Sequence, residues 1–199
     1  HYGKQILADQ PIRNARGVWN RTDQRPLEGF VYAVTPFNFT AISGNLPTAP
    51  ALMGNTVLWK PATTQQRAAS VVMDVLIEAG MPPGVINMVT GHGPEVSEVA
   101  LQHRDLAGIH FTGSTGVGKL AMRNASTTLK KVSLELGGKN PTLVFADSDW
   151  RGHLDVLVRS AFQNSGQICL CGSRILVERG EIAREAVTMT AIRQWLAAH

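Results

Sequence analysis

The sequence has little cysteine and no long apolar run, and both absences exclude whole classes of protein. Only two of its 199 residues are cysteine. These are Cys169 and Cys171, and a spacing of one residue is poor for a disulfide bond. No apolar stretch approaches the roughly 18 residues that a membrane-spanning helix needs. We therefore expect no disulfide framework and no membrane partner, and a reduced, cytoplasmic setting.

Clustered charge and metal-binding patterns are also missing. The formal net charge of +4 comes from 19 basic and 15 acidic residues, but only Lys130 and Lys131 are adjacent basic residues. A nucleic-acid surface needs clustered positive charge, so we expect no nucleic-acid partner. The six histidines show no chelating spacing with another His, Asp or Glu, so we expect no metal site. A phosphate-bearing cofactor is compatible with the modest positive charge.

What the sequence does contain is an alternation of short apolar runs with helical patterns. The strand-like runs are Phe30–Val34, Thr56–Trp59, Val85–Val89, Ala107–Phe111 and Val132–Leu136. The helical patterns between them are Ile42–Met53, Thr64–Ala79, Glu95–Leu101 and Val117–Ala125. This alternation predicts an α/β fold with a Rossmann-like parallel sheet and helices on both faces.

The second helical pattern predicts its own buried face and its end. Apolar residues recur there at spacings of three and four, as on one face of a helix. They are Ala68, Val71, Val72, Val75, Leu76 and Ala79. Gly80 and the Pro82-Pro83 pair then predict the end of the helix.

Polar and small residues follow the predicted strands at one edge of the sheet. Asn38 follows the first strand, Lys60 the second, Gly93 the third, and Gly113 with Ser114 the fourth. Open parallel sheets bind ligands outside the carboxyl ends of their strands. The pattern therefore predicts a nucleotide cleft at this edge.

The pattern restarts after Gly137-Gly138, which we interpret as a hinge. A strand over Thr142–Phe145, a helix over Asp149–Asn164 and a strand over Arg174–Val177 are expected, followed by a helical tail over Glu181–His199. We therefore predict a partial nucleotide-binding domain over residues 1–136. Residues 137–199 would form the beginning of a second α/β catalytic domain.

The glycine-rich segment Gly113–Lys119 admits two functional interpretations. It matches the phosphate-binding loop of nucleoside triphosphatases except at the following position, where Leu120 replaces the Ser or Thr that binds magnesium. Alternatively, Gly113 and Ser114 begin a helix whose free N–H groups and dipole face the pyrophosphate of a dinucleotide. A glycine-rich helix start without a ligand is a third alternative.

Five motifs follow one another along the chain. They are Thr35-Pro36-Phe37-Asn38-Phe39, Lys60-Pro61, Phe111-Thr112-Gly113-Ser114-Thr115, Leu134-Glu135-Leu136-Gly137-Gly138-Lys139-Asn140-Pro141 and Gly166-Gln167-Ile168-Cys169. In their order and spacing, the sequence resembles the aldehyde dehydrogenase superfamily over roughly residues 15 to 180. The resemblance implies oxidation of a small-molecule aldehyde with NAD or NADP as hydride acceptor.

The resemblance also implies three catalytic residues. Cys169 stands at the nucleophile position, while Cys171 is expected only to pack. Asn38 stands at the position of the amide that donates to the oxyanion together with the Cys169 backbone N–H. Glu135 stands at the position of the general base, and the end of an apolar strand should partly desolvate its carboxylate. A structural ion pair of Glu135 with a nearby lysine is the alternative.

The cofactor contacts implied by the resemblance follow the predicted strands. Lys60 corresponds to the residue that holds the adenosine ribose. Thr63 occupies a position where many NAD-preferring relatives carry an acid, so that NADP use stays open. The implied set is Thr35, Pro36, Lys60, Thr63, Gly93, Gly113, Ser114 and Leu136.

Two parts of the sequence resemble different branches of the superfamily. Residues 17–61, and the sequence on to about Thr115, resemble 1-pyrroline-5-carboxylate (glutamate semialdehyde) dehydrogenases. From Val117 onward the sequence is more similar to the hydroxymuconic semialdehyde group, so we expect a small semialdehyde. Family members are homo-oligomers more than twice this length. A non-catalytic nucleotide-binding fragment is therefore the alternative function.

Overall fold

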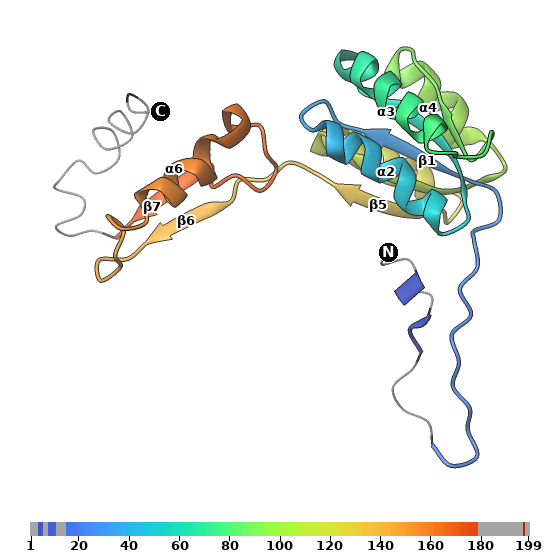
Figure 1. Cartoon of the computed structure of the whole chain (residues 1–199), viewed down its shortest axis with the longest axis horizontal. Coiled ribbons are helices and arrows are strands. Elements are labelled where there is room, and N and C mark those ends of the chain that lie inside the picture. Colours follow the sequence, from blue (N-terminus) through green and yellow to red (C-terminus); the bar gives the residue numbers. More distant parts are fainter. Residues whose placement is uncertain (1–3, 6–7, 11–14, 179–196, 198–199) are drawn as a thin grey trace. The chain divides into compact units, whose positions relative to one another are not determined.

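The computed structural model describes residues 4–5, 8–10, 15–178 and 197 (Figure 1). The chain divides into two compact units, residues 1–135 and residues 136–199. The division lies one residue before the boundary that the sequence suggested. No helix in the described ranges is long and apolar enough to cross a membrane.

The first unit contains a five-stranded sheet in which every neighbouring pair of strands is parallel. Its strands are β1 (Phe30–Thr35), β2 (Thr56–Pro61), β3 (Ile86–Met88), β4 (Leu106–Thr112) and β5 (Lys131–Glu135). All five lie within two residues of the predicted runs. The predicted α/β fold with a parallel sheet is therefore confirmed.

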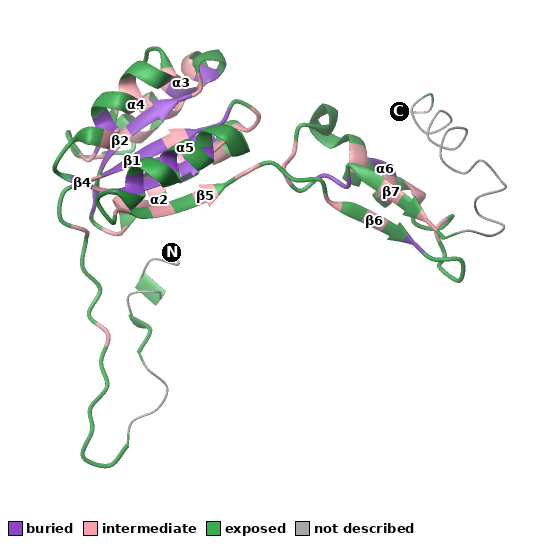
Figure 2. Ribbon diagram, turned by 180° about the vertical axis from the view of Figure 1, so that it is seen from behind, coloured by how far each residue is buried: buried purple, intermediate pink, exposed green. Residues whose placement is uncertain are grey.

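Helices lie on both faces of this sheet, and the burial of β1 shows why. Val31, Tyr32 and Ala33 are all buried although successive side chains of a strand point to opposite faces (Figure 2). Val31 and Ala33 belong to a core cluster on the face covered by α2 and α3. Tyr32 faces the opposite side, where α4 and α5 pack against β4.

The helices of the first unit begin and end close to their predicted bounds. They are α2 (Thr40–Leu52), the short 3-10 helix η1 (Thr63–Gln65), α3 (Gln66–Glu78), α4 (Gly93–Gln102) and α5 (Thr115–Ser126). Two prolines, Pro47 and Pro50, lie inside α2. The Pro50 carbonyl accepts hydrogen bonds from the backbone and side-chain amides of Asn55, which connect the end of α2 to β2.

The buried face of α3 differs in part from the prediction. Val71 and Val75 are 57% and 58% exposed, whereas Ala69 is fully buried. Val72 and Leu76 pack against the core cluster, as expected. Apolar residues at spacings of three and four fit two overlapping stripes on this helix. The stripe that contains Ala69 is the one that packs against the core cluster.

The strand order fixes where a ligand can enter. The order is β3-β2-β1-β4-β5, so the chain builds the sheet outward from β1 to β3 and then crosses to β4. The crossover directions diverge between β1 and β4. In open α/β sheets this divergence at the carboxyl edge opens a crevice for ligands.

The second unit contains a small parallel sheet and one α-helix among its described residues. Its elements are β6 (Pro141–Val144), α6 (Leu154–Phe162), the 3-10 helix η2 (Gln163–Gly166) and β7 (Arg174–Val177), with β6 paired to β7. The helix begins five residues later than predicted because Asp149 accepts a hydrogen bond from the Gly152 N–H and closes a turn. The predicted tail over Glu181–His199 lies outside the described residues except for residue 197.

Candidate active site

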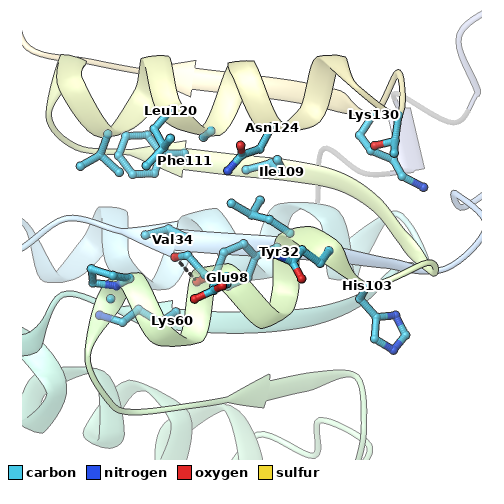
Figure 3. A pocket seen from close by; sticks show the side chains of 18 of the residues that line it. Tyr32, Val34, Lys60, Glu98, His103, Ile109, Phe111, Leu120, Asn124 and Lys130 are labelled. Atoms are coloured by element: carbon cyan, nitrogen blue, oxygen red, sulfur yellow. Dashed lines mark hydrogen bonds between the residues drawn. The ribbon is translucent and has the colours of Figure 1, made fainter.

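A pocket of about 740 Å³ lies between α4 and α5 in the first unit, at the divergence of β1 and β4. Val34, Ile109 and Phe111 form its floor on the sheet. Figure 3 shows Lys60, Phe111 and Leu120 toward one end of the pocket, and His103 and Lys130 toward the other. Most of its lining surface is apolar, as in sites for small organic ligands, and charged side chains such as Lys60, Glu98 and Lys130 also line it.

Two residues predicted to bind the cofactor, Lys60 and Gly93, meet at this pocket. Lys60 is only 4% exposed, and its Nζ donates a 3.0 Å hydrogen bond to the Pro61 carbonyl. Burial lowers the pKa of the Lys60 amine below its usual value. A Cβ added to Gly93 would lie 3.8 Å from the Lys60 Nζ, so a side chain there would occupy the space beside the amine.

The sequence analysis missed the polar pair inside the pocket. Tyr32 Oη and Ser97 Oγ lie 2.9 Å apart and join β1 to α4. Burial raises the pKa of the Tyr32 phenol, and the hydrogen bond to Ser97 opposes this shift in part. The period of two along β1 places Tyr32 and Val34 on one face. That Ser97 lies opposite them depends on the packing of α4, which the sequence does not reveal.

The start of α5 supports the dinucleotide interpretation of the glycine-rich segment. The Ser114 hydroxyl caps α5 by accepting from the Val117 N–H at 3.4 Å. The helix begins at Thr115, so a free loop of the kind that surrounds a triphosphate is absent between Gly113 and Lys119. Leu120, which stands where a magnesium ligand would be needed, lines the apolar pocket instead.

Thr35 holds the end of β1 rather than facing the pocket through its side chain. It is 2% exposed, its Oγ1 accepts from the Trp59 indole N–H at 2.9 Å, and it lies 3.0 Å from Ser43 Oγ. Because Ser43 is in the first turns of α2, these bonds fix both ends of the loop that carries Pro36 and Asn38. Pro36 is buried and Asn38 is half-buried.

Glu135 ends β5, which is an edge strand of the sheet. Its backbone carbonyl accepts a 3.0 Å hydrogen bond from the Gly113 N–H, so the end of β5 is tied to the start of the α5 turn. Glu135 is exposed. The prediction that the end of β5 partly desolvates its carboxylate is therefore wrong. The reason is that β5 has a neighbouring strand on one side only.

Cys169 lies in a loop of the second unit between η2 and β7. The residue is half-buried, whereas Cys171 is 5% exposed, in keeping with the packing role expected for Cys171. Two non-glycine residues just before the loop, Asn164 and Ser165, have positive φ angles of 52° and 57°. This sharp turn ends the helical segment, and Cys169 therefore lies in a loop, outside any helix or strand.

The remaining predicted residues take different positions. Thr63 is exposed at the start of η1, and Leu136 is half-buried at the start of the second unit. Asn38 and Glu135 belong to the first unit and Cys169 to the second. No group of three or more His, Cys, Asp or Glu side chains able to hold a metal ion occurs in the part of the chain that the structure describes.

Comparison with known proteins assigns the class. The chain matches the model of the aldehyde dehydrogenase family over residues 2–193. The protein belongs to this family.

Within the family, the chain is similar to two groups of semialdehyde dehydrogenases. It is 46% identical over 184 residues to delta-1-pyrroline-5-carboxylate dehydrogenase of Emericella nidulans, across 88% of this chain and 32% of the relative. It is 41% identical over 182 residues to 2-aminomuconic semialdehyde dehydrogenase of Danio rerio, across 90% of this chain and 37% of the relative. The chain thus spans about a third of the length of these relatives.

Solved structures agree with these sequence matches. The delta-pyrroline-5-carboxylate dehydrogenase of Mycobacterium tuberculosis bound with NAD matches with a TM-score of 0.81 and 49% identity, over 92% of this chain and 35% of that one. An aldehyde dehydrogenase of Bacillus cereus matches with a TM-score of 0.83 and 31% identity, over 98% of this chain and 39% of that one.

Proposed function

We propose that this chain carries the nucleotide-binding and nucleophile-bearing part of a dehydrogenase that oxidises a small semialdehyde to a carboxylate. The observation that carries the proposal is the buried Lys60 beside Gly93. Both line the pocket that lies where the crossovers diverge between β1 and β4. The cysteine loop supplies the nucleophile in the second unit.

The first chemical step uses Cys169 and Asn38. The Cys169 thiolate attacks the aldehyde carbon and forms a thiohemiacetal, in which the former carbonyl oxygen carries the negative charge. The Asn38 side-chain amide and the Cys169 backbone N–H donate hydrogen bonds to this oxygen. Removing one donor of this kind typically lowers the rate by about 100- to 1000-fold.

The second step releases the acid. A nicotinamide cofactor bound to the first unit would supply the acceptor for the hydride that leaves the thiohemiacetal carbon, so that a thioester would remain on Cys169. Glu135 then takes a proton from a water molecule, the hydroxide attacks the thioester carbon, and the Cys169 thiolate leaves. An exposed carboxylate can bind water in this role.

The cofactor chemistry fits the residues of the first unit. The pocket between α4 and α5 would hold the adenosine of such a cofactor, and the Lys60 amine would donate to its ribose hydroxyls. The first turn of α5, with the positive end of the helix dipole, would suit a pyrophosphate. Thr63 adds no negative charge near Lys60, so we propose that both NAD and NADP bind.

A direct test is turnover by the purified chain. With glutamate semialdehyde and NAD, the absorbance of the reduced cofactor should rise. The signal should vanish in Cys169→Ala and persist in Cys171→Ala. Equal loss of the signal in both variants would overturn the assignment of the nucleophile.

A second candidate function is nucleotide binding without turnover. It is favoured by the placement of Lys60, Gly93 and the start of α5 in the first unit, which contains no cysteine. Calorimetric binding of NAD to the chain, with no oxidation of any semialdehyde, would support this candidate and contradict the first.

A further inference from the structure

One side chain of the second unit holds the loop that carries Cys169. The Asn140 Nδ2 donates to the Cys169 carbonyl at 2.7 Å and to the Cys171 carbonyl at 3.3 Å. An amide nitrogen has two protons, so both are used on this loop. Asn140 lies just before β6, and the residue before a proline is restricted to extended backbone. The two hydrogen bonds therefore start from a stiff point of the chain.

The surrounding glycines show how closely the loop fits against its neighbours. A Cβ added to Gly138 would lie 2.5 Å from the Cys169 carbonyl oxygen, so no other residue fits there without a shift of the backbone. A Cβ added to Gly172 would collide with Thr142 Oγ1 on β6. The Gly172 N–H also donates to the Ser160 carbonyl of α6 at 3.0 Å.

The loop itself is a compact hydrogen-bonded turn. The Cys171 N–H donates to the Ile168 carbonyl at 3.0 Å, and the Ser173 N–H donates to the Cys171 carbonyl at 2.8 Å. The Cys171 carbonyl thus accepts from both Asn140 and Ser173. The Asn140 side chain therefore hydrogen-bonds directly to the backbone of Cys169.

We propose that Asn140 is a positioning residue that sets the orientation of Cys169 for catalysis. The inference rests on the proposed function, because it assigns a purpose to the orientation of the nucleophile. Cys169 contributes two groups to one step, its sulfur as nucleophile and its N–H as oxyanion donor. Both move together when the residue rotates, and the carbonyl held by Asn140 fixes that rotation.

The effect on the reaction follows from this geometry. Asn140 and the carbonyls that it holds belong to the second unit, whereas Lys60 and the pocket proposed for the cofactor belong to the first. Loss of the Asn140 side chain should therefore lower kcat while leaving the KM for NAD unchanged. A misplacement of a reacting group by about 1 Å costs on the order of 100-fold in rate, and we expect a decrease of about 10- to 100-fold.

The variants are Asn140→Ala, which removes both donors, and Asn140→Asp, which keeps the shape but faces two carbonyls with acceptors. The matched control is Asn87→Asp. Asn87 is an exposed asparagine of β3 whose Nδ2 also donates to a backbone carbonyl, that of Gly84 at 2.9 Å. It lies outside the proposed site, so it reports the general effect of losing one amide donor.

Two readouts on the full chain test the proposal. Hydrogen exchange of the amides of residues 171–173 should accelerate about tenfold in both Asn140 variants, because about two net hydrogen bonds are lost. It should not change in Asn87→Asp. Steady-state turnover rates, divided by the concentration of reactive thiol, should show the decrease in kcat in the Asn140 variants. The KM for NAD should stay unchanged.

The outcomes separate the two proposals. A parent chain without turnover contradicts the proposed function, while hydrogen exchange still tests whether Asn140 anchors the loop. A parent chain with turnover, together with Asn140 variants of equal kcat, would overturn the positioning role. Unchanged hydrogen exchange at residues 171–173 in Asn140→Ala would overturn it as well.

Discussion

Replacing Thr35 with valine should destabilise the chain by about 2–4 kcal/mol although it preserves the size of the side chain. The change removes an oxygen that accepts from the Trp59 indole N–H at 2.9 Å and lies 3.0 Å from Ser43 Oγ. Both partners are 0% exposed, so water cannot replace the lost hydroxyl. Each buried polar group left without a partner costs about 1–3 kcal/mol.

The measurement is urea unfolding of the purified variants, followed by fluorescence. Ser43→Ala alone should cost about 1 kcal/mol, because Thr35 still accepts from Trp59. The double variant Thr35→Val/Ser43→Ala should cost less than the sum of the single variants, since it removes one of the two orphaned groups. Thr56→Val is the control, because its hydroxyl donates a 3.4 Å hydrogen bond from an exposed position. Two results would refute the stabilising role of the hydrogen bonds among Thr35, Trp59 and Ser43. One is an equal loss of unfolding free energy in Thr35→Val and Thr56→Val. The other is a double variant whose loss equals the sum of the losses in the single variants.

Three further predictions concern the pocket. Leu120→Arg should weaken NAD binding by calorimetry at least about tenfold, whereas Met122→Arg, on the same helix but outside the pocket lining, should not; equal losses would contradict the assignment of the pocket. Burial lowers the pKa of Lys60, so the folded chain binds fewer protons than the unfolded chain between that lowered value and 10.5. Its unfolding free energy should rise with pH across this window, and the rise should be smaller in Lys60→Met; parallel pH profiles would refute this. Thr63→Glu should weaken binding of NADP more than binding of NAD, about fivefold for an added charge near the 2′-phosphate, and an unchanged preference would remove Thr63 from the ribose site.

Strands β1, β2 and β4 of the sheet could be predicted from the sequence because they are largely buried on both faces. Such strands appear as continuous apolar runs, as in Phe30–Thr35, and the sequence separates them clearly from the helices. The exposure of Val71 and Val75 could not be predicted, because helical spacing alone leaves the buried stripe free to rotate. The late start of α6 was hidden by the turn that Asp149 closes with Gly152.

The candidate site was predicted where single residues follow strands, and missed where the contact depends on packing. Lys60 lies near the carboxyl end of β2 and Gly93 begins the helix after β3, so their meeting at the carboxyl edge of the parallel sheet follows from topology. The Tyr32–Ser97 bond joins residues 65 positions apart, and Asn140 reaches Cys169 across 29. No local pattern marks either pair.

The most direct test of the account is to trap the acyl group on the nucleophile. In Glu135→Gln, which cannot activate water, incubation with NAD and glutamate semialdehyde should leave a thioester on the chain. Mass spectrometry of the tryptic peptide over residues 160–174, which holds both cysteines, should place the acyl group on Cys169. The account predicts that Asn38→Ala, added to Glu135→Gln, slows the formation of this adduct. An acyl group on Cys171, or a chain that reduces NAD but never carries an adduct, would contradict it.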